Sequence, residues 1–378
     1  MRAPYLVACT LGFATLTVAC SSNHDTLTGG SGGSGGAGTT SSGTGGSLLM
    51  TTTGSGGTVI NTDGGTTYPI YADTDTDLYT LDPSDPTLTM THLGAFDCIG
   101  ASGTPGQQST AMTDVAVDMS QNIWALSSYA VRQVTLQGTT VHCGQEIEVH
   151  VTDPDCGQPT DPGCYTDFPY IKFEALTFAP VGTISMTDEV LVAGDTAGEL
   201  WTIDTSSGAI TQHGIFGPVP ADDGRGHSYP AANVGKPFEL SGDMVFLANN
   251  GKPVGFATVR DCPSPPDNMG CNTVDTLIEI DMTAIATAGT QNVRKGILGQ
   301  VVRSSSGCSD SSAGYGSMYG IASWNAVVYG FSRPGQLVSV SNVDGSACLV
   351  KDYSPLQFSG AAVTTIAPVI PPPPPPTM

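Results

Sequence analysis

The sequence predicts an all-β protein, and three observations support that fold class. Gly (48) and Pro (27) make up about a fifth of the 378 residues, whereas charged residues make up only 12%. Between positions 68 and 368, β-branched and aromatic residues alternate with polar ones in short runs that end at Gly, Asn, Asp or Pro. Similar phrases then recur along this region. A composition of this kind excludes a helical bundle or a coiled coil.

The first element that we expect is an export signal over residues 1–19. It begins with Arg2, continues with an apolar stretch too short for a membrane-spanning helix, and ends on small residues before Cys20. The segment LTVAC at 16–20 resembles the lipobox of bacterial lipoproteins. That resemblance implies that Cys20 is lipidated, and Ser21 after it implies the outer membrane, on its periplasmic or its surface side. A plain secretory signal is the alternative.

Two low-complexity segments flank the rest of the chain. Residues 20–66 are mostly Gly, Ser and Thr, and such a segment buries too little apolar surface to become ordered. We expect a flexible linker with a mean reach on the order of 35 Å. Residues 371–378 contain a polyproline run, for which we expect an extended tail. The folded domain is therefore predicted over residues 67–370.

Within that domain three phrases recur. The most regular one is an alternating strand that ends in a turn: DLYTLDPS (77–84), AVRQVTLQ (130–137), ELWTIDTS (199–206), TLIEIDMT (276–283) and QLVSVSNV (336–343). A shorter apolar strand precedes each copy: YPIYAD (68–73), NIWALSS (122–128), EVLVAGD (189–195), MVFLANN (244–250) and AVVYGFS (326–332). A third phrase comes earlier still: MTDVAV (112–117), FEALTF (173–178), FELSGD (238–243) and MYGIAS (318–323). The first unit lacks it, but FSGAAV (358–363) supplies a copy near the C-terminus.

The displaced copy indicates a closed ring of sheets. If each unit is a four-stranded antiparallel sheet, the C-terminal strand completes the first sheet and removes its free edge. We therefore expect a β-propeller of five blades, with a pair of β-sandwiches as the alternative and a sixth blade hidden in an insertion as the main variant. The segment GELWTIDTSSGAIT at 198–211 resembles the repeats of YVTN and quinoprotein-like propellers. This resemblance implies a fold and no particular activity.

Eight cysteines remain after the signal and Cys20, and an even number in an exported chain indicates disulfides. Two pairs occupy equivalent places in two repeat units, which predicts Cys98–Cys143 and Cys308–Cys348. The other four lie close together in sequence, which predicts Cys156–Cys164 and Cys262–Cys271. A zinc site is disfavoured because no C-x₂-C spacing occurs.

Acidic residues supply the candidate metal ligands. Asp73, Asp75 and Asp77 stand at alternate positions, and oxygen-rich loops can hold Ca²⁺. Glu174 and Glu239, at equivalent places in the third phrase and joined by Asp114, are expected to face the central channel. They form a second candidate Ca²⁺ site, similar to that of calcium-dependent lactonase-type propellers. Solvated acidic turns are the alternative for both sets.

The functional prediction is a lipoprotein, anchored by its N-terminal lipid, whose propeller binds a protein or carbohydrate partner. The formal charge of −22 argues against nucleic acid, because phosphate contacts need clustered cations. We find no G-x-S-x-G, H-E-x-x-H or P-loop motif, so no catalytic residue is assigned. The alternative is a calcium-dependent hydrolase or lyase that works in the central channel through Glu174, Glu239 and Asp114.

Overall fold

The computed structural model describes residues 68–99, 111–127, 130–151, 172–249, 252–263, 270–305, 308, 310–325 and 327–369. The predicted signal, linker and tail lie outside the described residues, as do Cys20 and the predicted pair Cys156–Cys164. Strands make up nearly all of the regular structure in the described ranges, together with the 3₁₀-helix η3 (Ala284–Ala286). No helix within these ranges is long and apolar enough to cross a membrane.

The strands form antiparallel sheets of neighbours in sequence. The first group contains, in hydrogen-bonded order, β22 (Phe358–Ala362), β1 (Ile70–Thr74), β2 (Asp77–Leu81) and β3 (Met90–Phe96). The second contains β4 (Asp114–Val117), β5 (Ile123–Leu126), β6 (Ala130–Gln137) and β7 (Thr140–Cys143), with β8 (Ile147–Glu148) paired to β6. A parallel pairing of β3 with β7 joins these two groups into one sheet.

The other sheets are separate. One contains β10 (Phe173–Ala179), β11 (Val190–Asp195), β12 (Glu199–Ile203) and β13 (Ala209–Ile215), with β9 (His150–Val151) parallel to β13. The next contains β14 (Glu239–Leu247), β15 (Val254–Arg260), β16 (Thr276–Ile280) and β17 (Arg294–Gln300). The last contains β18 (Met318–Trp324), β19 (Val327–Ser332), β20 (Gln336–Ser341) and β21 (Ala347–Asp352).

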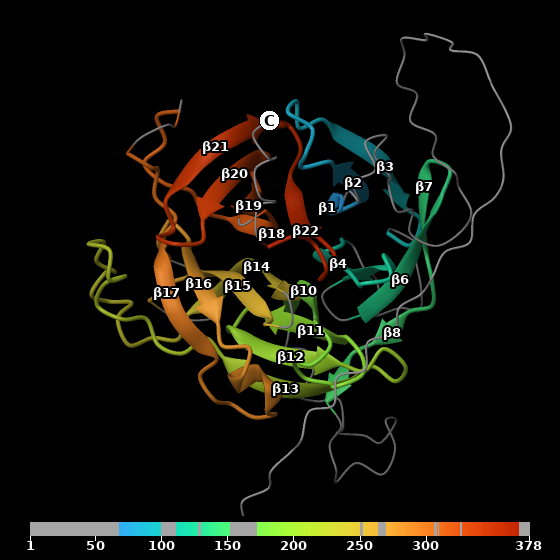
Figure 1. The fold of residues 1–378 in the computed structure, drawn as a ribbon, viewed down its shortest axis with the longest axis horizontal. Coiled ribbons are helices and arrows are strands. Elements are labelled where there is room, and N and C mark those ends of the chain that lie inside the picture. The colour runs from blue at the N-terminus through green and yellow to red at the C-terminus, as the bar shows by residue number, and fades with distance from the viewer. Residues whose placement is uncertain are drawn as a thin grey trace, which may run out of the picture. The chain divides into compact units, whose positions relative to one another are not determined.

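The first strands of these groups meet around a central axis. Strand β4 contacts β10, β10 contacts β14, β14 contacts β18, β18 contacts β22, and β22 contacts β4 (Figure 1). The displaced C-terminal phrase forms β22, which pairs antiparallel with β1, as its place in the repeat predicts. Antiparallel sheets arranged radially around an axis, each with its first strand innermost, define a β-propeller.

Burial along the strands follows distance from the axis. Every described residue of β4, β14 and β22 is buried, including the carboxylates Asp114, Glu239 and Asp243. The outermost strands β3 and β7 alternate between buried and exposed positions, because only one of their faces packs against a neighbouring sheet. The apolar core therefore lies between the strand groups, in clusters that each draw on two or more groups.

One strand assignment from the sequence is wrong. The phrase MVFLANN was expected to form the second strand of its unit, but residues up to Leu247 continue the innermost strand β14. The second strand is β15, which lies in the segment 251–275 that we expected to be an insertion. A register irregularity between Leu240 and Met244 accounts for the extra length, because it lets one strand carry both phrases.

Three of the four predicted disulfides are present in the structure. Cys98 bonds to Cys143, Cys262 to Cys271, and Cys308 to Cys348. The first and third occupy equivalent places in two sheets, since each joins the chain entering an innermost strand to the outermost strand of the same sheet.

The segment after β22 closes one end of the axis. Residues 363–369 cross the connections between the first and second strands of the other groups. Thr364 Oγ1 donates to the carbonyl of Asp118 (2.8 Å), and Thr365 bonds to the Ala248 amide (2.7 Å) and to Glu189. The Pro368 carbonyl accepts from the amide of Asn325 (2.7 Å). This end of the axis is therefore covered by the C-terminal segment.

Candidate functional site

The opposite end of the axis, where the innermost strands begin, carries the longest connections; we term it the loop face. The starts of adjacent innermost strands lie side by side, since Thr113 Oγ1 donates to the carbonyl of Phe173 (3.3 Å). In antiparallel sheets the connections that enter a first strand or join the second strand to the third leave from this same end. The described residues of these connections are 97–99, 111–113, 172, 216–238, 261–263, 270–275, 301–305, 308 and 310–317. Each of the three described disulfides includes a cysteine from one of these connections.

Ion pairs surround the axis at the loop face. Lys172 Nζ lies 2.8 Å from Glu174 Oε1, and Arg260 Nε lies 3.3 Å from Glu239 Oε2. We call the wider set the mouth cluster, and it comprises Asp75, Lys172, Glu174, Glu239, Arg260, Tyr319, Arg333 and Ser359. Three of the protein's 12 lysines and arginines thus lie at the loop face of an acidic chain, each paired with a carboxylate.

The most elaborate of these pairs joins Arg333 to Asp75. The guanidinium donates to both oxygens of the carboxylate, at 2.7 and 2.8 Å, and to Ser359 Oγ (2.7 Å), which itself donates to Asp75 (2.6 Å). The Arg333 Cζ atom lies 6.0 Å from the centre of the Tyr319 ring. These bonds from Arg333 lower the pKa of Asp75. The Arg333 and Asp75 side chains remain 35% and 45% exposed, so a ligand can reach them.

The structure does not assemble the predicted channel set of Glu174, Glu239 and Asp114. Each glutamate already has a cationic partner at the loop face. Asp114 is fully buried and accepts hydrogen bonds from the amides of Val115 (2.7 Å) and Leu176 (2.5 Å). Among the described residues, no three carboxylates bring their oxygens within 4.8 Å of one another. The geometry therefore does not support the hydrolase or lyase alternative.

The three alternating aspartates also lie apart. Asp73 lies near the end of β1, Asp75 in the hairpin turn, and Asp77 at the start of β2, so the three do not follow one strand. Asp73 is fully buried, Asp75 bonds to Arg333, and Asp77 lies 2.8 Å from Nε2 of His92.

Two groups of potential ligand atoms do lie close together, but each contains a disulfide. They are Asp97 with Cys98 and Cys143, and Glu239 with Cys262 and Cys271. A cysteine in a disulfide offers no thiolate, which is the form that binds metals. Neither group is therefore a metal site.

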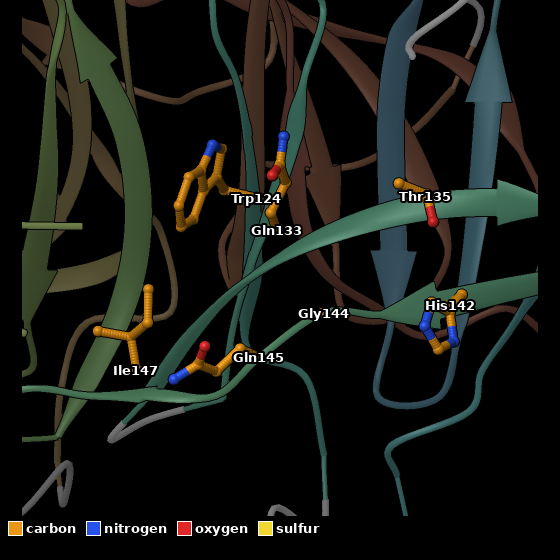
Figure 2. Close-up of a pocket in the computed structure, with 7 residues that line it drawn as sticks. All are labelled: Trp124, Gln133, Thr135, His142, Gly144, Gln145 and Ile147. Carbon is orange, nitrogen blue, oxygen red and sulfur yellow. The ribbon is translucent and has the colours of Figure 1, made fainter. Parts of the chain in front are cut away.

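A hollow of about 250 Å³ is a second candidate site. It lies on the outer part of the β4–β7 group and is lined by Trp124, Gln133, Thr135, His142, Gly144, Gln145 and Ile147 (Figure 2). Trp124 and Gln133 lie at one end of it, and His142 lies at the other. The His142 ring is already engaged, since its Nδ1 lies 2.7 Å from Asp97. Nothing in this hollow points to a particular ligand, so the mouth cluster is the stronger candidate.

The sequence did not single out Arg260 or Arg333, although a signal was present. Both stand at the loop-face end of a second strand, at the turn that leads into the third strand. The chain has only 12 lysines and arginines, so two arginines at equivalent turns of the repeat would have indicated that both lie at the same end of the axis. Arg260 was missed because its strand had been assigned to an insertion.

Buried Asp195, at the end of β11, predicts an unusual dependence of stability on pH. Burial raises its pKa to about 7, while hydrogen bonds from the Glu199 amide (2.9 Å) and Trp201 Nε1 (3.2 Å) only partly offset this effect. The folded chain keeps this proton up to about pH 7, whereas the unfolded chain releases it near pH 4. The free energy of unfolding should thus fall between pH 5 and 7, by at most about 1.4 kcal/mol per pH unit from this group.

Asp195→Asn should reduce that slope. Urea unfolding of both chains at pH 5, 6, 7 and 8, with EDTA present, measures the difference. Asp204→Asn is the matched control, because hydrogen bonds from Ser206 lower the pKa of that exposed carboxyl and it stays charged throughout this range. Identical slopes for the native chain and Asp195→Asn would contradict the prediction.

Comparison with known proteins gives no family. No family model matches the chain, and no curated protein matches it. Similar solved structures include a protein of unknown function from Bacteroides caccae (9% identity, TM-score 0.30, 79% of this chain and 99% of that one). Others are U3-55K (10%, 0.33, 79% and 82%) and BBS1N in complex with ARL6DN (7%, 0.28, 71% and 59%). Likenesses at this level carry no argument, so the fold assignment rests on the strand pairing described above.

Proposed function

We propose that this chain is a lipid-anchored, five-bladed propeller of the bacterial envelope whose loop face binds a protein partner. The five innermost strands in mutual contact support the blade number, and the repeat at 198–211 supports kinship with YVTN and quinoprotein-like propellers. The segment LTVAC at 16–20 and the Gly/Ser/Thr-rich residues 20–66 support the anchor and its linker.

The mouth cluster is the observation that carries the binding function. Arginine and tyrosine are enriched where protein interfaces hold their binding energy. At the loop face Arg333 lies beside Tyr319, and Arg260 pairs with Glu239 at the same face. The C-terminal segment 363–369 covers the other end of the axis. A partner that approaches along the axis therefore meets the loop face.

The charge of the chain indicates the chemistry of the partner. A net charge of −22 steers positively charged surfaces toward the protein and repels acidic ones. We therefore expect a protein partner with a basic binding surface. A carbohydrate ligand, which would bind with little dependence on salt, is the other outcome of the test below.

The experiment compares the full-length chain with two variants in Gram-negative cells. Wild type should sediment with the outer membrane and Cys20→Ala should be soluble, if Cys20 is the anchor. Arg333→Ala should weaken partner capture by at least about tenfold, as expected for loss of an arginine hot spot. Lys295→Ala, whose exposed side chain pairs with Glu279 on the outer part of its sheet, should capture the partner as wild type does.

Three outcomes would overturn parts of this proposal. Membrane attachment of Cys20→Ala would exclude the lipid anchor. Equal capture by Arg333→Ala and Lys295→Ala would exclude the mouth cluster as the binding surface. The partner would be a carbohydrate rather than a protein if the chain bound a glycan array and captured no protein. That binding would also persist in 0.5 M salt, where the Debye length is about 4 Å and charge interactions are screened.

A further inference from the structure

Two buried aspartates on different innermost strands meet at the propeller axis. Asp114 lies on β4 and Asp243 on β14, and neither side chain is exposed to solvent. Their carboxyl groups are hydrogen-bonded to each other. Strand β10 stands between β4 and β14 in the ring, so this bond joins strands that are not neighbours.

The same two carboxyl groups also bind the other three innermost strands. Asp114 accepts the amide of Leu176 in β10 (2.5 Å). Asp243 accepts the amides of Ile321 in β18 (2.6 Å) and of Ala361 in β22. Each aspartate further accepts the amide of the residue that follows it. A single carboxyl–carboxyl hydrogen bond therefore completes a connection among the innermost strands of all five groups.

Two glycines allow the strands to pack closely around this pair. A Cβ placed on Gly360, in β22, would lie 2.1 Å from Asp114 Oδ1. A Cβ placed on Gly242, next to Asp243, would lie 2.3 Å from the Tyr319 Cα atom in β18. The space around both carboxyl groups is therefore filled by backbone, which is why solvent does not reach them.

A hydrogen bond between two carboxyl groups needs a proton. Ionised carboxylates only accept hydrogen bonds, and two of them in contact repel each other. Burial raises the pKa of both groups well above the ordinary value, and the charge of Asp243 raises the pKa of Asp114 further. One group of the pair is thus an acid that donates, and the other accepts.

The strands in closest contact with β4 and β14 supply no cation that could replace this proton. They are β1, β5, β10, β11, β15, β18 and β22, and their ionisable side chains are Tyr71, Asp73, Glu174, Asp195, Arg260 and Tyr319. Arg260 pairs instead with Glu239 at the loop face. Asp73 is fully buried as well, and its charge raises the pKa of Asp114. Among the described residues, no ion pair includes Asp114 or Asp243.

We propose that Asp114 and Asp243 form a pH-sensitive latch, which holds the five innermost strands together while the two carboxyl groups share a proton. When this proton leaves for water, two carboxylates remain in contact inside the protein beside buried Asp73, and the closed ring is destabilised. The latch does not depend on the proposed binding function, because neither aspartate belongs to the mouth cluster.

The latch has a defined effect on the pH dependence of stability. The unfolded chain releases the proton near about pH 4, the ordinary range for aspartate, whereas the folded chain keeps it to a higher pH. The stabilisation is therefore complete below about pH 4 and is lost as the pH rises through the pKa of the folded state. Where only the folded chain holds the proton, the unfolding equilibrium constant rises about tenfold per pH unit.

Urea unfolding of the full chain at pH 5, 5.5 and 6 tests this effect with Asp114→Asn. The amide keeps the shape of the side chain and can donate to Asp243 without a titrating proton. The rise in the unfolding equilibrium constant per pH unit should therefore be smaller than in wild type, by up to about tenfold. Asp243→Asn should behave in the same way. Asp204→Asn, which removes a carboxyl that is charged throughout this range, should match wild type.

Infrared spectroscopy of the folded wild-type chain at pH 6 gives a readout that needs no variant to fold. It should show the carbonyl band of a protonated carboxylic acid, which shifts in D₂O and disappears on thermal unfolding at the same pH. Part of this band should be missing from Asp114→Asn and present in Asp204→Asn. A folded wild-type chain without the band would overturn the proposal. So would wild-type pH dependence in both Asp114→Asn and Asp243→Asn.

Discussion

Ending the chain after Leu356 is expected to abolish cooperative folding of the propeller. The truncation removes β22, whose five residues are all buried and which supplies the fourth strand beside β1. Phe358 packs edge-on against Phe331, with ring centres 5.2 Å apart. Loss of one buried phenylalanine alone costs about 3–5 kcal/mol, against a typical total stability of about 5–15 kcal/mol. The truncation also removes the segment 363–369 that bonds to four other parts of the ring.

Thermal unfolding followed by near-UV circular dichroism measures this effect. The truncated chain should show no cooperative transition, because β1 gains a free edge and β4 and β18 lose their neighbour. The matched control ends after residue 370 and removes only the polyproline tail, so it should unfold like the full chain. A cooperative transition in the shorter chain at the same Tm would show that β22 is dispensable.

Gly360→Ala is expected to destabilise the folded chain by about 3 kcal/mol or more, because the added methyl has no room. Its Cβ would lie 2.1 Å from Asp114 Oδ1 and 2.5 Å from the Asp114 Cα, which is backbone and cannot rotate away. Accommodating it would push β22 away from β4. For a domain of this size we expect a fall in Tm of about 6–12 °C.

Gly296→Ala is the control for the intrinsic effect of the substitution. Gly296 also lies within a strand, β17, but a Cβ placed on it meets no atom within 4 Å. The stability of the Gly296→Ala variant should change little, because alanine fits the extended backbone and reduces the conformational entropy of the unfolded chain. Equal Tm values for the two variants would mean that the axis is not packed as described.

The strands were largely predictable because their signal is local. A strand that packs one face against a neighbouring sheet alternates between apolar and polar residues, whatever its partners are. The segments ELWTIDTS and QLVSVSNV show this alternation, and they contain β12 and β20. The prediction failed at MVFLANN, whose first residues continue the fully buried strand β14 without alternation. In such a run the sequence does not show where one strand ends. The end of β14 and the position of β15 were therefore assigned incorrectly.

The repeat also placed residues that are distant in sequence. FSGAAV could be assigned to the first sheet because that unit lacked its own copy, and β22 indeed pairs with β1. Equivalent positions in two units likewise predicted Cys98–Cys143 and Cys308–Cys348. Both inferences compare one unit with another and need no knowledge of how the units meet.

The candidate sites could not be predicted in this way, because they form where different units meet. The sequence by itself determined the all-β class, most of the strands and the closure of the ring, since a period of two and a repeated phrase are properties of the chain alone. Only the tertiary structure decided that Glu174 pairs with Lys172 while Asp75 holds Arg333. It also decided that Asp73 and Asp114 both pack against Gly360, because that packing depends on a missing side chain in a strand almost 300 residues from Asp73.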